Sequence, residues 1–205
     1  MPAEIRTTQV GPWSMNTYVI VDTDTGLSAI VDPGADAAKI LALAEGTRVD
    51  KILLTHAHHD HWGALDEVRS ATGAPVYMHP AETQTAPVDF DEPLAGGDTL
   101  MLGTLEIAVV HTPGHAPGLV CFVVDDQNAI VGDTLFVGGP GRTWNAAQFD
   151  QTMRTLQDVV FRWPDDMRFH PGHGPSGSIG QERAAFEAFV ARGWPADLFG
   201  DVTWE

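Results

Sequence analysis

A histidine-rich segment, residues 55–63 (THAHHDHWG), contains four side chains that can bind a metal ion. These are His56, His58, Asp60 and His61. Imidazole and carboxylate groups are ligands that suit zinc, iron and manganese. Because one residue separates His56 from His58, both face the same side of an extended chain. Asp60 and His61 reach a neighbouring point where the chain turns into a helix, so we expect this one segment to serve two adjacent metal ions.

Three more candidate ligands follow other predicted strands. Residues at strand ends that are distant in sequence can converge on one edge of a sheet. Asp133 is suited to bridge two cations, because its carboxylate has two oxygens and Gly132 permits close approach of the backbone. Seven ligands, one of them bridging, leave open positions for water, as in a catalytic rather than a structural site. The expected ligand set is His56, His58, Asp60, His61, His115, Asp133 and His173.

The other histidines are expected to have different roles. His59 alternates away from the cluster, and His79 lies in a stretch expected to be a surface loop. His111 and His170 lie at predicted strand ends, where we expect them to pack or to support the ligands. Asp32 is expected to accept a hydrogen bond from a ligating histidine, because such histidines usually donate their second N–H to a carboxylate or a carbonyl.

The hydrophobic pattern predicts the elements that position these residues. Short apolar runs bounded by turn residues predict strands, and longer periodic stretches predict helices. Two strand-rich halves, each followed by helices, predict an α/β protein with a β-sandwich covered by helices on its outer faces. The length fits one domain over residues 1–205. The expected strands are 18–21, 27–31, 49–55, 76–78, 99–102, 105–110, 119–124, 129–131 and 167–170; the expected helices are 35–44, 64–72, 149–161 and 179–192; residues 80–97 are expected to form a surface loop or a partial helix.

The composition excludes several classes of protein. Eleven Lys and Arg against 28 Asp and Glu give a formal net charge of −17, which disfavours nucleic acid because phosphate binding needs clustered basic residues. No apolar stretch is long enough to span a membrane and the N-terminus lacks a signal-peptide pattern, so we expect a cytoplasmic protein. The partner that we expect is a small-molecule substrate, not nucleic acid or a membrane. Cys121 is the single cysteine, and its apolar surroundings predict a buried packing role. The oligomeric state is left open.

The chain resembles the metallo-β-lactamase superfamily in the motif at residues 56–61 (HAHHDH, the pattern HxHxDH), followed by His115, Asp133 and His173. The segment 32–34 (DPG) matches that family's early acidic motif. The resemblance covers almost the whole chain and implies a four-layer αββα sandwich. The ligand sets that it implies are His56, His58 and His115 for one metal and Asp60, His61 and His173 for a second, with Asp133 bridging the two.

Within that superfamily the chain resembles the glyoxalase II-like branch, in particular its short, single-domain bacterial members. The segments 132–136 (GDTLF) and 171–175 (PGHGP) carry this resemblance, and Asp133 argues against the β-lactamases, which lack a bridging aspartate. Long glyoxalase II enzymes add a C-terminal helical region that helps to bind glutathione, and we expect this chain to lack it. Arg142 aligns with a basic residue of the family's substrate loop and is expected to meet a substrate carboxylate. Trp144 stands where relatives often have Asp or Tyr, and we expect it to contact substrate too.

The activity implied is hydrolysis of a thioester, such as an S-acylated small thiol, by a hydroxide that bridges two divalent metal ions. Zinc is the expected metal, with iron or manganese as alternatives. The two cations lower the pKa of a shared water and polarise the carbonyl. Asp60 both ligates and accepts a proton from the attacking water.

Two other activities would use the same residues. A persulfide dioxygenase would hold a single non-haem Fe(II) with His56, His115 and Asp133, a set that leaves open positions for oxygen and substrate. Lactone hydrolysis would use the same hydroxide chemistry as thioester hydrolysis. A metal-binding protein without activity is disfavoured, because a degenerate relative would normally have lost ligands and this chain has lost none. We therefore expect a dinuclear hydrolase.

Overall fold

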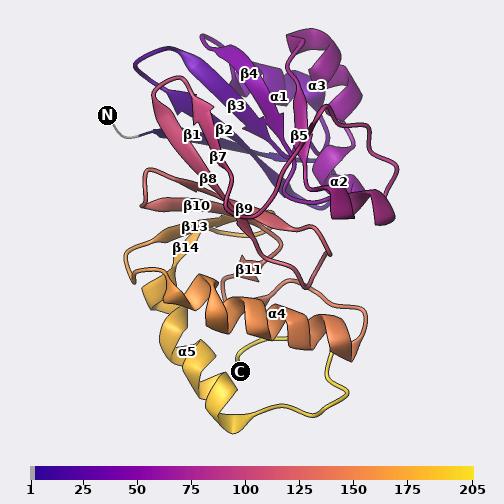
Figure 1. Ribbon diagram of the computed structural model, residues 1–205, viewed down its shortest axis with the longest axis vertical. Coiled ribbons are helices and arrows are strands. Elements are labelled where there is room, and N and C mark those ends of the chain that lie inside the picture. Colours follow the sequence, from indigo (N-terminus) through magenta and orange to yellow (C-terminus); the bar gives the residue numbers. More distant parts are fainter. Residues whose placement is uncertain (1–2) are drawn as a thin grey trace.

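Two six-stranded sheets lie face to face between two layers of helices in the computed structural model, which describes residues 3–205 (Figure 1). The first sheet comes from the N-terminal half of the chain and the second from the C-terminal half, which confirms the expected αββα sandwich. In spatial order the first sheet contains β1 (Glu4–Val10), β2 (Met15–Asp22), β3 (Leu27–Val31), β4 (Arg48–Leu53), β5 (Val76–Met78) and β6 (Glu92–Pro93). The second contains β14 (Gly177–Ser178), β13 (Arg168–Pro171), β10 (Asn128–Gly132), β9 (Val120–Val124), β8 (Leu105–His111) and β7 (Thr99–Leu102).

Helices cover the outer face of each sheet (Figure 1). The first sheet is covered by α1 (Ala37–Leu43) and α3 (Leu65–Thr72), with the short α2 (His59–Trp62) beside them. The second is covered by α4 (Ala146–Asp158) and α5 (Ile179–Arg192). The shorter elements are the 3-10 helices η1 (Pro80–Gln84) and η2 (Val160–Arg162) and the paired strands β11 (Leu135–Phe136) and β12 (Gly139–Pro140).

Three clusters of buried apolar side chains within residues 3–205 fill the spaces between the four layers. The central cluster joins the two sheets through residues such as Ile20 and Phe122, which are fully buried. Val68 of α3 belongs to the cluster beneath the first helical layer, and Phe149 of α4 belongs to the cluster beneath the second. Strands that are covered on both faces are apolar along their length rather than alternating. β9 (VCFVV) follows this pattern and is buried from end to end, whereas β2 (MNTYVIVD) is also buried throughout but contains the polar residues Asn16, Thr17 and Asp22.

Some predicted boundaries differ from the observed ones. We did not predict β1, because its sequence EIRTTQV is mostly polar, as suits an edge strand that pairs with β2 alone. The strand expected over residues 49–55 ends at Leu53, so His56 lies in a loop. Helix α4 begins at Ala146, earlier than expected, because the Asn145 side chain caps it by accepting a hydrogen bond from the Gln148 N–H at 3.0 Å.

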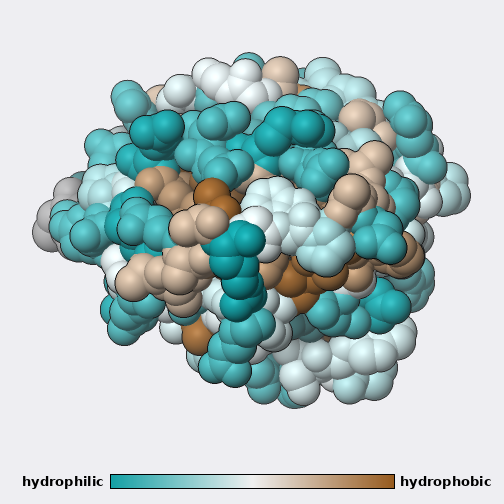
Figure 2. Space-filling model, turned by 90° about the horizontal axis from the view of Figure 1, so that it is seen from below, coloured by the Kyte–Doolittle hydropathy of each residue, from teal (hydrophilic) through white to brown (hydrophobic). Residues whose placement is uncertain are grey.

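The face of the molecule that Figure 2 shows is mainly hydrophilic, in keeping with the acidic composition. Figure 2 views the molecule from the side of α4 and α5, where hydrophobic residues gather in the middle of a hydrophilic rim. The exposed large apolar side chains of the described residues include Trp13, Val137 and Trp144. No helix in the described part of the chain is both long and apolar enough to cross a membrane.

Cys121 is expected to resist thiol reagents in the folded protein. Its side chain is fully buried in β9, with Sγ 3.4 Å from Thr112 Oγ1 and 3.5 Å from Thr134 Oγ1. Burial raises the pKa of the Cys121 thiol to about 11, so on the order of 10⁻³ of it is ionised at pH 8. We predict that a chromogenic disulfide reagent labels native protein only very slowly and labels about one thiol per chain in guanidinium. Rapid labelling of the native protein would contradict the packing role.

Candidate metal centre

The seven side chains predicted to bind metal come together where the strands β4, β8, β10 and β13 end. Among the described residues, three overlapping groups of nitrogen and oxygen atoms could each hold a metal ion, and within each group the atoms lie within 4.8 Å of one another. The groups are His56, His58 and His115; His56, His61 and Asp133; and Asp60, His61 and His173.

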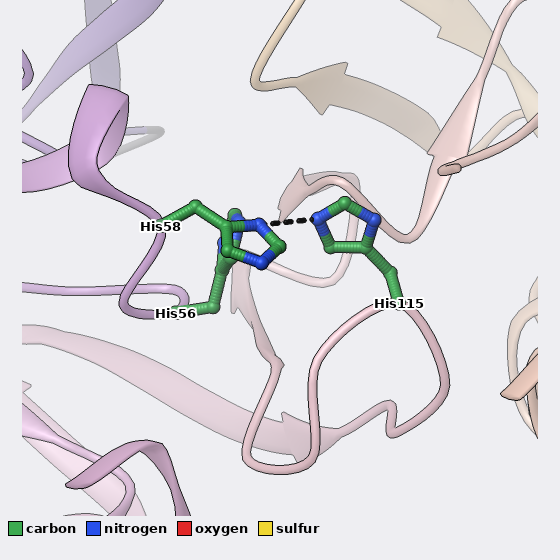
Figure 3. Close-up of side chains that lie close together, drawn as sticks. All are labelled: His56, His58 and His115. Carbon is green, nitrogen blue, oxygen red and sulfur yellow. Dashed lines mark hydrogen bonds between the residues drawn. The ribbon is translucent and has the colours of Figure 1, made fainter. Parts of the chain in front are cut away.

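The first of these, which we call the three-histidine group, consists of His56, His58 and His115 (Figure 3). His56 and His58 come from the loop after β4, and His115 comes from the loop between β8 and β9. His58 Nδ1 lies 3.0 Å from His56 Nε2 and 2.8 Å from His115 Nε2. Side chains from two distant loops therefore present their nitrogens to one point.

Asp60, His61 and His173 form a second group, which we call the aspartate–histidine group. Asp60 and His61 lie in α2, and His173 follows β13. The Asp60 Oδ2 atom is 3.0 Å from His173 Nε2 and 4.0 Å from His61 Nε2. Segment 56–61 thus contributes to both groups, as the spacing of its residues predicts.

Asp133 lies between the two groups. Its Oδ2 atom is 3.5 Å from His115 Nε2 and 4.0 Å from His173 Nε2, and its Oδ1 atom is 3.4 Å from His61 Nε2. His61 Nε2 and Asp133 Oδ1 are buried and make no hydrogen bond to any described residue. A buried polar atom without a partner is costly. Two such atoms facing each other fit a site that a cation completes.

A buried hydrogen-bonded chain orients His56 and His61. The His61 Nδ1–H donates to Asp32 Oδ2 at 2.9 Å, and the Thr55 hydroxyl donates to the same oxygen at 2.7 Å. His56 Nδ1 lies 3.0 Å from that hydroxyl oxygen. The Thr55 N–H donates to Asp32 Oδ1 at 2.8 Å. One carboxylate therefore fixes the Nδ1 side of both rings and leaves each Nε2 toward the centre. Asp32 makes the contact that we predicted for it.

Backbone carbonyls orient two of the other histidines. The His115 Nδ1–H donates to the Arg142 carbonyl at 2.7 Å, and the His173 Nδ1–H donates to the Trp13 carbonyl at 3.3 Å. Trp13 lies in the turn between β1 and β2, so the N-terminal hairpin reaches the loop after β13. Each ring thus has a support on the side away from the centre.

Two glycines let the backbone approach the centre closely. A Cβ atom at Gly172 would overlap Asp133 Oδ1 and a ring carbon of His61, and a Cβ atom at Gly34 would overlap the backbone of Asp60. Any larger residue at either position would push candidate ligands apart.

The protonation states of His56, His58 and Asp133 suit metal binding, whereas the nearby carboxylates raise the pKa of His61 and His173, so a cation would have to displace a proton there. Burial, together with the neighbouring His61 and His115, lowers the pKa of His56 well below its ordinary value. Burial and His115 likewise lower the pKa of His58 to about 4. Burial acts to raise the pKa of Asp133, but the nearby His61, His115 and His173 together outweigh it, so the pKa of this carboxyl lies below its ordinary value. Neutral imidazole and ionised carboxylate are the forms that bind metal ions.

A pocket of about 640 Å³ opens onto both groups, with Asp60, His115, Asp133 and His173 in its wall. Arg142 also lines the pocket, and its Nη1 pairs with Asp201 Oδ2 at 3.1 Å. The ring of Trp144 packs beside the three-histidine group, with its centroid 5.1 Å from that of His58 and 5.2 Å from that of His115. The structure therefore brings Arg142 and Trp144 to the same place as the candidate ligands.

Two parts of the pocket wall escaped the sequence analysis. One is Trp13, and the other is the C-terminal segment 201–203. The latter is held by Trp204, whose backbone N–H donates to the Gly138 carbonyl at 2.9 Å and whose indole N–H donates to Glu182 Oε2 at 3.0 Å. Short-range patterns carry no signal for contacts of this kind.

The remaining histidines lie outside the three groups. His59 is exposed and packs against Trp62, as expected. His170 Nε2 lies 3.0 Å from Asn128 Oδ1, which is a packing role. His79 differs from expectation, because it is half-buried rather than on an open loop and stacks on His111 with ring centroids 4.5 Å apart.

Asp32→Asn is predicted to weaken metal binding without unfolding the protein. An amide cannot accept hydrogen bonds through both of its heteroatoms, so it loses either the Thr55 N–H or the pair of bonds on Asp32 Oδ2. We expect zinc affinity to fall by about 10- to 100-fold in competition with a chelator. Asp22→Asn is the matched control, since Asp22 is also buried and hydrogen-bonded but lies at the far end of β2. Equal zinc affinity in Asp32→Asn and wild type would refute the role of Asp32.

Comparison with known proteins agrees with this geometry. The family profile of the metallo-beta-lactamase superfamily matches residues 10–185. The probable metallo-hydrolase YqgX of Bacillus subtilis is 33% identical over 195 residues, covering 85% of this chain and 92% of its own. A hydroxyacylglutathione hydrolase of Polaromonas is 35% identical over 162 residues, which is 76% of this chain. The present chain spans 60% of the length of that enzyme.

Solved structures point to the same family. The BLEG-1 B3 metallo-beta-lactamase has a TM-score of 0.81 and 31% identity, covering 88% of this chain and 97% of its own. TTHA1623 in a di-iron-bound form has a TM-score of 0.75 and 30% identity, covering 87% and 96%. ETHE1 from Myxococcus xanthus has a TM-score of 0.76 and 29% identity, covering 88% and 81%. The chain therefore belongs to the metallo-β-lactamase superfamily, with hydroxyacylglutathione hydrolases among its homologues.

Proposed function

We propose that the protein is a dinuclear metal-dependent hydrolase that cleaves the thioester of a small acylated thiol, as glyoxalase II-like enzymes do. The position of Asp133 carries the proposal. Its two carboxylate oxygens approach His115 and His61, which belong to separate ligand groups. A carboxylate shared in this way supports two cations at adjacent positions, which is the arrangement that two-metal hydrolases use.

Two bound cations would lower the pKa of a water molecule and polarise the thioester carbonyl. Asp60 lies in the pocket wall with Oδ2 3.0 Å from His173 Nε2, where it can accept the proton of the attacking water. Addition of water breaks the C–S bond and gives a carboxylic acid and a thiol. No side-chain nucleophile is needed, in agreement with the burial of Cys121.

Arg142 and Trp144 are the residues that we propose hold the substrate. The Arg142–Asp201 pair is exposed, so its net stabilisation is small and a substrate carboxylate can take the place of Asp201. Trp144 is 48% exposed and lies against His58 and His115, so its ring can cover one side of the bound thioester.

A persulfide dioxygenase is the second candidate, favoured by the similarity to ETHE1. Its single iron would use His56, His115 and Asp133, and His115 Nε2 lies 3.5 Å from Asp133 Oδ2. The two candidates differ in whether the aspartate–histidine group is needed for activity. A dinuclear hydrolase requires this group, whereas a mononuclear iron enzyme does not.

The proposal is tested by assaying protein loaded with zinc, iron or manganese on S-acylglutathione, other thioesters, lactones and a β-lactam. We expect thioesters to be the best substrates. His173→Ala is predicted to lower kcat/KM by about 10²-fold or more, because it removes part of one cation site. His59→Ala is the matched control: His59 is exposed and belongs to none of the three groups, so its activity should stay within about threefold of wild type.

A persulfide dioxygenase would give different activities in these assays. Oxygen uptake with glutathione persulfide, retained in His173→Ala and accompanied by no thioester hydrolysis, would overturn the proposal in favour of the dioxygenase.

Arg142→Ala is predicted to raise KM selectively for thioesters that carry a carboxylate. Loss of an exposed charged hydrogen bond corresponds to about tenfold in KM, with kcat little changed because the Arg142 backbone carbonyl that supports His115 remains. Steady-state kinetics would compare KM for a thioester that carries a carboxylate with KM for the same thioester in which that carboxylate is esterified. Arg69→Ala, which removes an ion-paired arginine on the outer surface, serves as control. An equal KM change for both substrates would contradict a carboxylate-binding role.

A further inference from the structure

Two glutamates are buried among residues 3–205, and each joins two segments of the chain. Glu82 in η1 is 0% exposed and Glu182 in α5 is 6% exposed. Glu82 lies in the stretch that the sequence predicted to be a surface loop or partial helix. A buried carboxylate needs hydrogen-bond donors to offset its desolvation, so the donors that it meets indicate which parts of the chain it holds together.

Glu82 links the two loops that supply the three-histidine group. Its Oε2 atom accepts a hydrogen bond from the Ala57 N–H at 2.7 Å, and its Oε1 atom accepts one from the Gly118 N–H at 2.6 Å. Ala57 lies between His56 and His58, and Gly118 closes the loop that contains His115. Each carboxylate oxygen therefore holds one of the two loops whose rings meet in Figure 3.

The surroundings of Glu82 keep this link rigid. A Cβ atom at Gly118 would come within 2.7 Å of His79 Nδ1 and 3.0 Å of Glu82 Cγ, so only glycine lets the loop lie this close. The His79 ring is stacked on His111 with an interplanar angle of 6°. His111 Nε2 lies 3.0 Å from the Pro117 carbonyl, next to Gly118. The base of the His115 loop is thus packed against η1 as well as hydrogen-bonded to it.

We propose that Glu82 is a positioning residue, whose carboxylate fixes the His56–His58 loop relative to the His115 loop and thereby sets the affinity of the three-histidine group for a metal ion. The inference rests on the proposed role of these histidines as ligands. It assigns a role in metal binding to a residue that bonds to the backbone of the two loops. Without the link, metal binding must also order two independent loops, which weakens the binding.

Glu82→Gln is the informative variant, because the two bonds of Glu82 fall on different oxygens. Glutamine has one acceptor oxygen, so one N–H loses its partner and faces the amide NH₂ group. Glu182→Gln is the matched control. Both donors of Glu182, the Gly138 N–H and the Trp204 indole N–H, bond to the same oxygen, Oε2, at 2.8 and 3.0 Å. A glutamine carbonyl can keep both of those bonds.

The experiment is a titration of metal-free protein with zinc against a chelator of known affinity, with thermal stability measured on the same samples. We expect one of two binding steps to weaken by about 10- to 100-fold in Glu82→Gln and the other to change by less than about threefold. Glu182→Gln should bind zinc like wild type. To assign the affected step, the titration is repeated in a His173→Ala background, where the remaining step should show the same loss.

Wild-type zinc affinity in Glu82→Gln would overturn the inference. So would equal weakening of both steps together with a loss of thermal stability, since that result indicates general destabilisation. If Glu82→Gln does not fold, Glu82→Asp takes its place: it retains the charge but is one methylene too short to reach both N–H groups, and the same selective loss is expected. Because the readout is metal affinity, it decides the inference whether or not the wild type hydrolyses a thioester.

Discussion

The arrangement of the site depends on the placing of a buried carboxylate, Asp133, among imidazoles that lie where two sheets meet. Removing such groups from water is expensive unless opposite charge and hydrogen bonds compensate. On their outer sides the rings are satisfied, His61 by Asp32 and His115 by a backbone carbonyl. On the inner side His61 Nε2 and Asp133 Oδ1 have no hydrogen-bond partner among residues 3–205. These two buried atoms without partners lie where the candidate ligands converge, and a cation bound there would interact with both.

The sandwich places these groups because the ligands come from both sheets. Segment 56–61 follows a strand of the first sheet, whereas His115, Asp133 and His173 follow strands of the second. Their spacing is therefore set by how the sheets pack. The central apolar cluster fixes that packing, and polar bonds reinforce it close to His173. The Tyr18 hydroxyl donates to the Pro171 carbonyl at 2.7 Å, and the Asn16 amide donates to the same carbonyl at 3.0 Å.

The sequence allowed prediction of features that depend on neighbouring residues, but not of contacts between residues that are far apart along the chain. The dense spacing of residues 56–61 and the recurrence of His and Asp at strand ends were enough to select the side chains that converge, and Asp32 followed from the need of a ligating histidine for a second partner. Glu82 could not be selected. Its importance lies in bonds to Ala57 and Gly118, 25 and 36 residues away, and its local sequence reads as a polar surface. Trp13 and segment 201–203 were missed for the same reason.

The family shown by the comparisons contains proteins with different names built on this fold, so the fold alone does not determine the reaction. A protein called a β-lactamase shares 31% identity with the chain, so a β-lactam belongs among the substrates that are assayed. What separates the proposed activity from its rivals is whether the aspartate–histidine group holds a cation beside the one held by the three-histidine group. Arg142 and Trp144 affect the choice of substrate, not this distinction.

The most direct test is the metal content of tag-free protein, measured by elemental analysis after purification from cells supplied with both zinc and iron. We predict about two metal ions per chain in wild type and a clear decrease in Asp133→Ala, because the proposed centre shares that carboxylate between both sites. A content close to one iron per chain, with little zinc or manganese, would contradict the dinuclear centre and favour a mononuclear iron enzyme.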